Sequence, residues 1–135
     1  MVSERTSLMM RQLMRMVVTE GSGKKAEVAG YRVGGKTGTA EKVVNGRYSH
    51  TAVLSSFLAT FPADNPRYAV IVTLDNPKGL PSTFNFSTAG WNATPTAGKV
   101  IAAIAPMLEV SPGIDPFQAA DPKSGPLMVA SMKGD

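Results

Sequence analysis

The fold is decided by residues 31–46, which have the sequence Tyr-Arg-Val-Gly-Gly-Lys-Thr-Gly-Thr-Ala-Glu-Lys-Val-Val-Asn-Gly. The threonines and valines favour a strand over 31–44, and the Asn-Gly pair that follows is a strong signal for a tight β-hairpin turn. Glycines at 34, 35 and 38 would weaken an ordinary strand, because glycine has no side chain to pack. This spacing predicts a strand whose backbone another molecule approaches closely.

Two further strands are predicted after this turn. One covers 52–61, and the other covers 68–74, which is a nearly continuous apolar run. Such a run is typical of a central strand that is covered on both faces. The proline-bounded turn over 62–66 and the Asn-Gly turn are short, so neighbouring strands should be antiparallel.

One helix is predicted before these strands in the sequence, and one after them. The first spans 3–20, with Ser3 as N-cap and Gly21-Ser22-Gly23 after its end. Its apolar repeat predicts that one face, methionines included, fills the core, while Arg11 and Arg15 lie on the other side. The second helix should begin with Thr94 as N-cap and Pro95 in the first turn. Its core face should hold Val100, Ile101, Ile104 and Leu108, and Pro106 should kink or end it.

The order helix, three strands, helix predicts an α+β fold with an antiparallel sheet flanked by helices. We expect one domain over 1–110 and a flexible C-terminal tail over 111–135, where prolines and glycines interrupt any periodicity.

Composition excludes several functional classes. Lys and Arg number 14 and Asp and Glu number 10 among 135 residues, so the net charge is +4. The basic residues are scattered, so nucleic acid is not an expected partner. Without cysteine, and with His50 as the single histidine, disulfide scaffolds, cysteine nucleophiles and multi-histidine metal centres are excluded. No signal peptide is recognisable, and no apolar run reaches the ~20 residues that span a bilayer. We expect no metal, no cofactor and no membrane span in this chain.

The tetrapeptide Lys36-Thr37-Gly38-Thr39 is the sharpest chemical signal. Alternate residues of a strand share a face, so Thr37 and Thr39 lie together, with Lys36 and Gly38 on the other side unless twist moves the lysine. Two hydroxyls and an ammonium form a compact strip for an anion, and Gly38 lets an extended peptide lie against the backbone. Taken alone, the tetrapeptide fits an ordinary solvent-exposed edge strand better than a binding strip.

The surrounding sequence resembles the class B penicillin-binding proteins, above all the septal peptidoglycan D,D-transpeptidases of cell division. The resemblance covers about residues 4–108, and its motifs are Lys-Thr-Gly within 30–42 together with the segments 20–25, 63–70 and 75–79. It implies the C-terminal part of the penicillin-binding transpeptidase and serine β-lactamase-like fold.

In that family a serine attacks the peptide bond between two D-alanines of a peptidoglycan stem peptide, and β-lactams mimic this substrate. The resemblance implies catalytic roles for Lys36, in proton movement and electrostatics, and for Thr39, whose backbone N–H would form half of the oxyanion hole. It implies substrate binding by Thr37, Gly38 and Thr39, with the hydroxyls on the terminal carboxylate and Gly38 keeping the wall open.

The nucleophile is expected to lie outside this sequence. The family places Ser-x-x-Lys, and then Ser-x-Asn, well upstream of Lys-Thr-Gly, and Ser22-Gly-Lys-Lys25 lies only 14 residues before Lys36. We interpret Ser22 as part of a loop and not as a nucleophile. The chain alone should be inactive, and should pair either with the missing N-terminal part or with itself. The parent protein is expected at the periplasmic face of the bacterial inner membrane.

Two alternatives remain open. One is a non-catalytic module that binds peptidoglycan peptides or β-lactams, or that serves in assembly. The other is a serine β-lactamase or carboxypeptidase relative, which the Asp-Asn-Pro-Arg-Tyr segment over 64–68 disfavours. For His50, without an obvious carboxylate partner, a surface role is expected. Phe84, Phe86 and Trp91 could rim a substrate groove or pack in the core.

Overall fold

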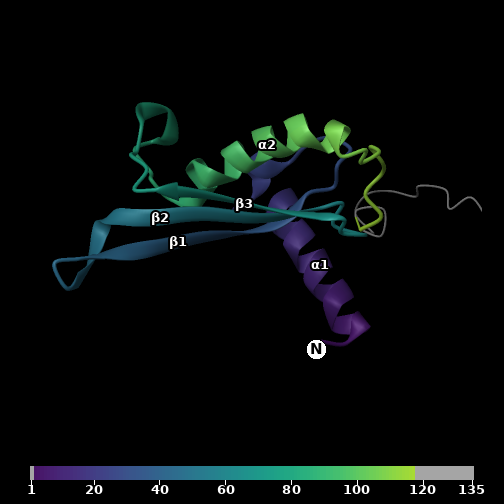
Figure 1. The fold of residues 1–135 in the computed structure, drawn as a ribbon, viewed down its shortest axis with the longest axis horizontal. Coiled ribbons are helices and arrows are strands. Elements are labelled where there is room, and N and C mark those ends of the chain that lie inside the picture. Colours follow the sequence, from purple (N-terminus) through teal and green to yellow (C-terminus); the bar gives the residue numbers. More distant parts are fainter. Residues whose placement is uncertain (1, 118–135) are drawn as a thin grey trace, which may run out of the picture.

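Helices and strands follow the order that the sequence predicts (Figure 1). The computed structural model describes residues 2–117. Its elements are α1 (Glu4–Thr19), the 3-10 turn η1 (Lys24–Ala26), β1 (Gly34–Val44), β2 (Arg47–Phe61), β3 (Tyr68–Asp75), the 3-10 turns η2 (Pro81–Thr83) and η3 (Ala89–Trp91), and α2 (Ala93–Met107). The α+β architecture with an antiparallel sheet flanked by helices is confirmed.

The sheet is antiparallel with strand order β1-β2-β3. Asn45 and Gly46 form the predicted turn, and both have positive φ, at 52° and 77°. This turn and the short loop after β2 place β2 between its two neighbours in sequence. Among the described strands, the one over 68–74 that was predicted to be central and doubly covered is therefore not central. Within residues 2–117, β3 lies at an edge and alternates between faces, so that Ile71 is 68% exposed.

The core lies between α2 and one face of the sheet (Figure 1). Phe57 and Phe61 of β2 are fully buried there beside Ile101 of α2. Alanines at 93, 97 and 105 of α2 are buried too, so this helix lies close to the strands. Its N-cap is Asn92 and not Thr94, because the Asn92 side-chain oxygen accepts a hydrogen bond from Ala93 N. Pro106 lies in the last turn, where the helix ends as predicted.

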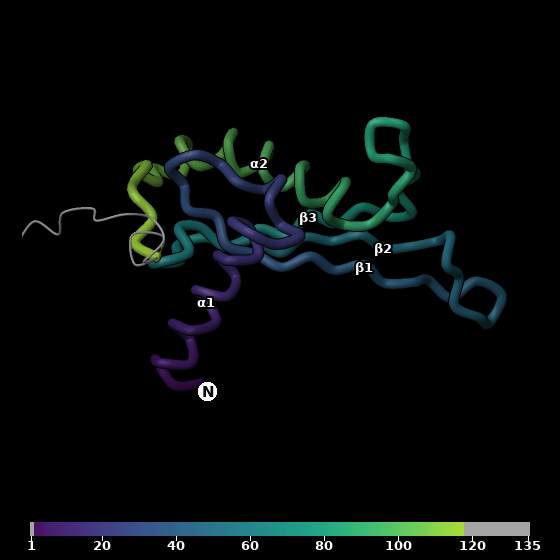
Figure 2. The backbone as a smooth tube through the Cα atoms, turned by 180° about the vertical axis from the view of Figure 1, so that it is seen from behind, coloured from purple at the N-terminus to yellow at the C-terminus, as the bar shows by residue number. Residues whose placement is uncertain are grey.

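The face of α1 that enters the protein differs from the predicted one. Ser3 is the N-cap, as expected, and its hydroxyl accepts from Thr6 N. Only Arg15 and Val18 are buried, whereas Leu13 and Met16 are about half exposed. Figures 1 and 2 show why: α1 contacts the sheet through its C-terminal half and projects from it at its N-terminal half. The apolar repeat therefore faces away from the core of these residues.

Arg15 joins four segments of the chain. Its guanidinium bonds to Asp115 at 2.5 Å, to Glu27, and to the carbonyl of Val33 at 2.8 Å. Burial by itself would lower the pKa of Arg15, but the hydrogen bonds and charges of Glu27 and Asp115 outweigh it and raise the pKa above its ordinary value. The arginine that the sequence pattern put on the solvent side is thus a buried cation at the start of β1.

Gly113 and Asp115 attach the segment over 111–117 to the rest of the molecule. Gly113 N donates to Gly30 O at 2.8 Å, and Asp115 pairs with Arg15. The predicted flexible tail over 111–135 begins before these contacts, and its residues 118–135 lie outside the described part of the chain.

Candidate functional site

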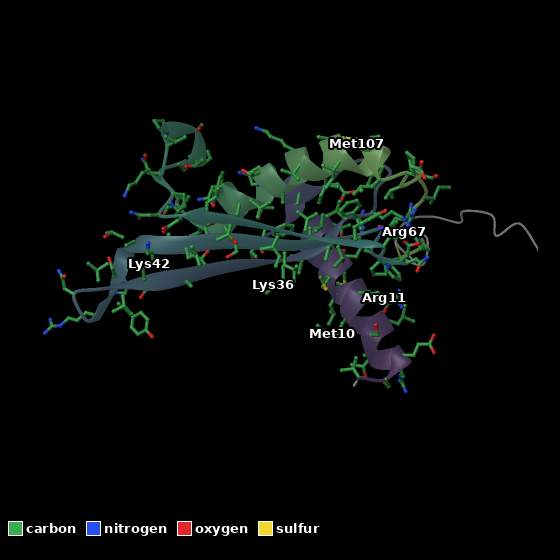
Figure 3. All side chains as sticks on the ribbon, in the orientation of Figure 1. Met10, Arg11, Lys36, Lys42, Arg67 and Met107 are labelled. Atoms are coloured by element: carbon green, nitrogen blue, oxygen red, sulfur yellow. The ribbon has the colours of Figure 1, made fainter. Side chains whose placement is uncertain are left out.

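The Lys-Thr-Gly-Thr segment lies in the first half of β1, which is an edge strand of the sheet within residues 2–117. Thr37 and Thr39 pair with Phe57 and Ser55 of β2, whose side chains are buried on the face that α2 covers. Lys36 and Gly38 pair instead with Leu58 and Ser56, on the opposite face. Figure 3 shows Lys36 on that side of the sheet, away from α2. The structure therefore brings the two threonine side chains together on one face of the sheet and puts the Lys36 side chain on the other.

A cavity of about 380 Å³ opens beside the two threonines. The loop after α1, the strand β1 and the η3 turn form its walls. Its lining is rich in hydroxyl and ammonium groups and includes Ser22, Lys24, Lys25, Thr37, Thr39, Thr88 and the ring of Trp91. Among residues 2–117, no Asp or Glu lines it. The arrangement favours an anionic ligand over a cationic one.

Hydrogen bonds fix the hydroxyls in this cavity. Ser22 Oγ lies 2.9 Å from Thr37 Oγ1, and Ala89 N donates to Thr39 Oγ1 at 3.1 Å. On the other face, Lys36 Nζ donates to the carbonyl of Thr37 at 2.5 Å. Each threonine is thereby held by a segment that is distant in sequence.

Gly38 and Gly35 have different surroundings on the same strand. A Cβ added at Gly38 would meet only Ser56 O and Oγ, both at 3.9 Å. A Cβ at Gly35 would come within 2.5 Å of the Phe57 ring. The fold therefore needs glycine at 35, whereas at 38 it leaves room above the strand.

Trp91, which lines the cavity, belongs to a small aromatic cluster. Trp91 stacks on Phe86 with ring centroids 5.7 Å apart and contacts Phe84 edge-on at 5.4 Å. Phe84 and Phe86 are exposed, so they do not pack in the core of residues 2–117. Lys25 Nζ lies 3.3 Å from the centre of the Trp91 ring. This cation–π contact holds a positive charge at the mouth of the cavity.

Several of these groups were missed by sequence reasoning. The sequence predicts a loop at Ser22 and no role for Lys25 or Ala89, because no local pattern shows that distant segments meet at β1. His50 has a partner after all, since its Nδ1 lies 2.5 Å from Glu41 Oε1. That pair lies on the exposed β1–β2 hairpin and does not line the cavity. Within residues 2–117 no cluster of metal-binding side chains occurs, and neither helix is long and apolar enough to cross a bilayer.

Comparison with known proteins identifies the family. Residues 1–101 match the penicillin binding protein transpeptidase domain. The probable peptidoglycan D,D-transpeptidase FtsI of Caulobacter vibrioides is 52% identical over 118 residues, which cover 81% of this chain and 20% of that protein. Stage V sporulation protein D of Bacillus subtilis is 45% identical over 111 residues, which cover 82% of this chain and 16% of that protein.

A solved structure supports the same relationship. Penicillin binding protein 3 of Mycobacterium tuberculosis, complexed with ampicillin, superposes with a TM-score of 0.71 at 31% identity. The alignment covers 85% of this chain and 26% of that one. The chain thus spans about a fifth of the length of the curated relatives it matches.

Proposed function

Because this chain belongs to the penicillin-binding protein transpeptidase family, we propose that it forms one wall of a peptidoglycan D,D-transpeptidase active site. The serine nucleophile would come from polypeptide outside this sequence. The observation that carries the proposal is the open cavity at an exposed edge strand, with both Thr37 and Thr39 in its lining.

The wall is suited to the D-alanyl-D-alanine end of a stem peptide. An extended peptide could run along the free edge of β1, which Gly38 leaves open. Its terminal carboxylate would accept hydrogen bonds from Thr37 and Thr39, and the N–H of Thr39 would stabilise the oxyanion after attack. β-Lactams would occupy the same position, because they carry an equivalent carboxylate.

Lys36 would act from the other face of the strand. That face carries Leu58 and Ile71, which are exposed within residues 2–117. We propose that the rest of the transpeptidase domain covers it and brings the serine to Lys36, whose ammonium would assist proton transfer. The acyl-enzyme would form there as D-alanine leaves. An amine of a neighbouring peptidoglycan strand would then accept the acyl group.

The remaining parts of the proposal concern context. The name of the Caulobacter relative supports a peptidoglycan D,D-transpeptidase. We propose that this activity cross-links peptidoglycan during cell division and that the parent protein lies at the periplasmic face of the inner membrane. We also keep 1–110 as the domain and 111–135 as a tail.

Fluorescent penicillin tests this function. The 135-residue chain alone should acquire no covalent label. A chimaera of the Caulobacter relative, in which residues 4–108 replace the matching segment, should be acylated at the relative's serine. Lys36→Ala in that chimaera should lower the acylation rate by about a hundredfold or more.

Two results would contradict the proposal. Covalent labelling of the chain alone would show that it carries its own nucleophile. A folded chimaera that fails to react would show that this wall cannot complete the site.

A non-catalytic binding module is the second candidate. It requires only the cavity with Thr37 and Thr39 in its lining, and no nucleophile. This candidate predicts reversible binding of penicillin to the chain alone, together with an unreactive chimaera, so the same experiment separates the two.

A further inference from the structure

Ser22 lines the cavity and lies in the loop that follows α1. Its loop is fixed by hydrogen bonds from Gly21 N to Met16 O, at 3.1 Å, and from Gly23 N to Val17 O, at 2.8 Å. These bonds hold Ser22 Oγ against Thr37 Oγ1, 15 residues along the chain. The loop therefore presents a third hydroxyl next to the two threonines of β1.

The hydrogen bonds determine which hydroxyl protons remain available. Ala89 N donates to Thr39 Oγ1, so the Thr39 proton is free to be donated into the cavity. The contact between Ser22 and Thr37 uses the proton of one partner and leaves that of the other. Three hydroxyls thus retain two free protons, one for each oxygen of a carboxylate.

Lys25 supplies a positive charge that complements the negative charge of a carboxylate. It lines the cavity and lies over the Trp91 ring, while no acidic side chain of residues 2–117 lines the same space. Its backbone is fixed because α2 packs directly on it: a Cβ added at Gly98 would lie 3.0 Å from Lys25 O. The ammonium therefore lies over the Trp91 ring, in the lining of the same cavity as the hydroxyls, before any ligand arrives.

We infer that Ser22 and Lys25 are binding residues of this cavity. Together with Thr37 and Thr39 they form a site for the terminal carboxylate of a D-alanine peptide. Ser22 sets the direction of the Thr37 hydroxyl or donates in its place, and Lys25 balances the charge. This inference rests on the proposed function, in which Thr37 and Thr39 bind that carboxylate.

Trp91 makes the site measurable, since it is the single tryptophan of the chain and lines the cavity. The 135-residue chain would be titrated with N-acetyl-D-alanyl-D-alanine and with its neutral C-terminal amide, and the dissociation constants taken from Trp91 fluorescence. We expect the acid to bind more tightly than the amide. Ser22→Ala should weaken binding of the acid by about two- to tenfold, as for one lost hydrogen bond.

Lys25→Met should weaken binding of the acid by about two- to fivefold, as expected for the loss of an exposed ion pair. Binding of the amide should not change. The substitution should also reduce the salt dependence of acid binding. Lys99→Met, which removes an exposed lysine of α2 that does not line the cavity, is the matched control and should change the binding of neither ligand.

Ser22→Thr retains the hydroxyl and should bind both ligands as the wild type does. Ser22→Val has the same shape as the threonine variant, so the difference between these two isolates the hydroxyl even if loop packing changes.

The possible outcomes distinguish this inference from the proposed function on which it rests. If Thr37→Ala and Thr39→Ala weaken binding of the acid while Ser22→Val and Lys25→Met do not, the inference is overturned and the proposed function stands. If the wild-type chain does not distinguish acid from amide, both are overturned, because the cavity is then no carboxylate site.

Discussion

At the scale of single residues, two glycines of β1 have different functions. Gly35 is buried against Phe57, and a side chain there would collide with a ring and with the Leu58 carbonyl, each 2.5 Å from the added Cβ. Gly38 has open space above it. One glycine is thus required by packing, whereas the other has open space on the face of the sheet opposite α2.

Replacing each glycine by alanine separates these roles. Gly35→Ala should lower the free energy of unfolding by about 1–3 kcal/mol, because it overpacks the core. Gly38→Ala should change that free energy by less than about 1 kcal/mol, yet slow acylation of the chimaera by fluorescent penicillin. Urea unfolding of the chain and labelling of the chimaera measure the two effects. Equal stability losses at both positions would contradict the assignment.

Arg15 is the second residue for which tertiary contacts matter more than sequence pattern. Its side chain is 4% exposed and its partner Asp115 is 8% exposed. Removing one member of a buried ion pair leaves the other charge unpaired.

Arg15→Met should therefore destabilise the chain by about 3 kcal/mol or more. Arg15→Lys should cost less, because it keeps the charge but loses the forked hydrogen bonds. Arg5→Met, at an exposed position of α1, is the control and should have little effect. Urea denaturation distinguishes the three variants, and an Arg15→Met protein as stable as the control would exclude this role.

At the scale of elements, Asn92 joins α2 to the sheet and to the loop above the cavity. Its side-chain oxygen accepts hydrogen bonds from Ala93 N and from Ser55 Oγ, and its amide donates to Ser87 O at 2.8 Å. The neighbouring Thr94 hydroxyl is buried and has no hydrogen-bond partner within residues 2–117. The side chain that caps the helix therefore also positions the loop that carries Ala89 and Trp91.

Asn92→Ala should lower the free energy of unfolding by about 1–2 kcal/mol, because it removes the cap and the bond to Ser55. Asn92→Asp keeps the accepting oxygen but loses the donor to Ser87, so a smaller loss is expected. Thermal unfolding followed by circular dichroism measures both variants. If Thr94→Ala lowered the stability more than Asn92→Ala, Thr94 and not Asn92 would be the N-cap of α2.

At the scale of the whole molecule, apolar side chains remain uncovered on two surfaces. One is the sheet face opposite α2, with Leu54, Leu58 and Ile71, and the other is the projecting part of α1, with Met10 among its exposed residues (Figure 3). Exposed apolar surfaces of this kind mark sites of contact with other polypeptide. Our proposal that the rest of the transpeptidase domain covers the sheet face explains why the chain leaves it open.

The isolated chain should therefore associate with itself as its concentration rises. Ile71→Ser, at an exposed position of β3, should shift the equilibrium towards monomer without loss of secondary structure. Sedimentation velocity over a range of concentrations measures the change. Ala69→Ser, on the same face but with little apolar area, is the matched control. A wild-type chain that stays monomeric at every concentration would contradict this prediction.

Local chemistry was enough to predict much of this protein. The Asn-Gly pair determines a hairpin, since both residues tolerate positive φ, and Ser3 determines the start of α1. The alternation of β1 puts Thr37 and Thr39 on one face, and the motifs around Lys36 led to the family. Each of these features depends on residues that are neighbours in sequence.

Only the tertiary structure decided which surfaces are buried and which groups meet. The periodicity of α1 defines an apolar face but not its partner, so Arg15 could be buried while the methionines were left exposed. The apolar run of β3 gave no information on strand order, which depends on the turns on both sides of β2. Ser22, Lys25 and Ala89 reach the threonines of β1 because α1, α2 and the sheet pack together, and long-range packing leaves no signal in any single stretch of sequence.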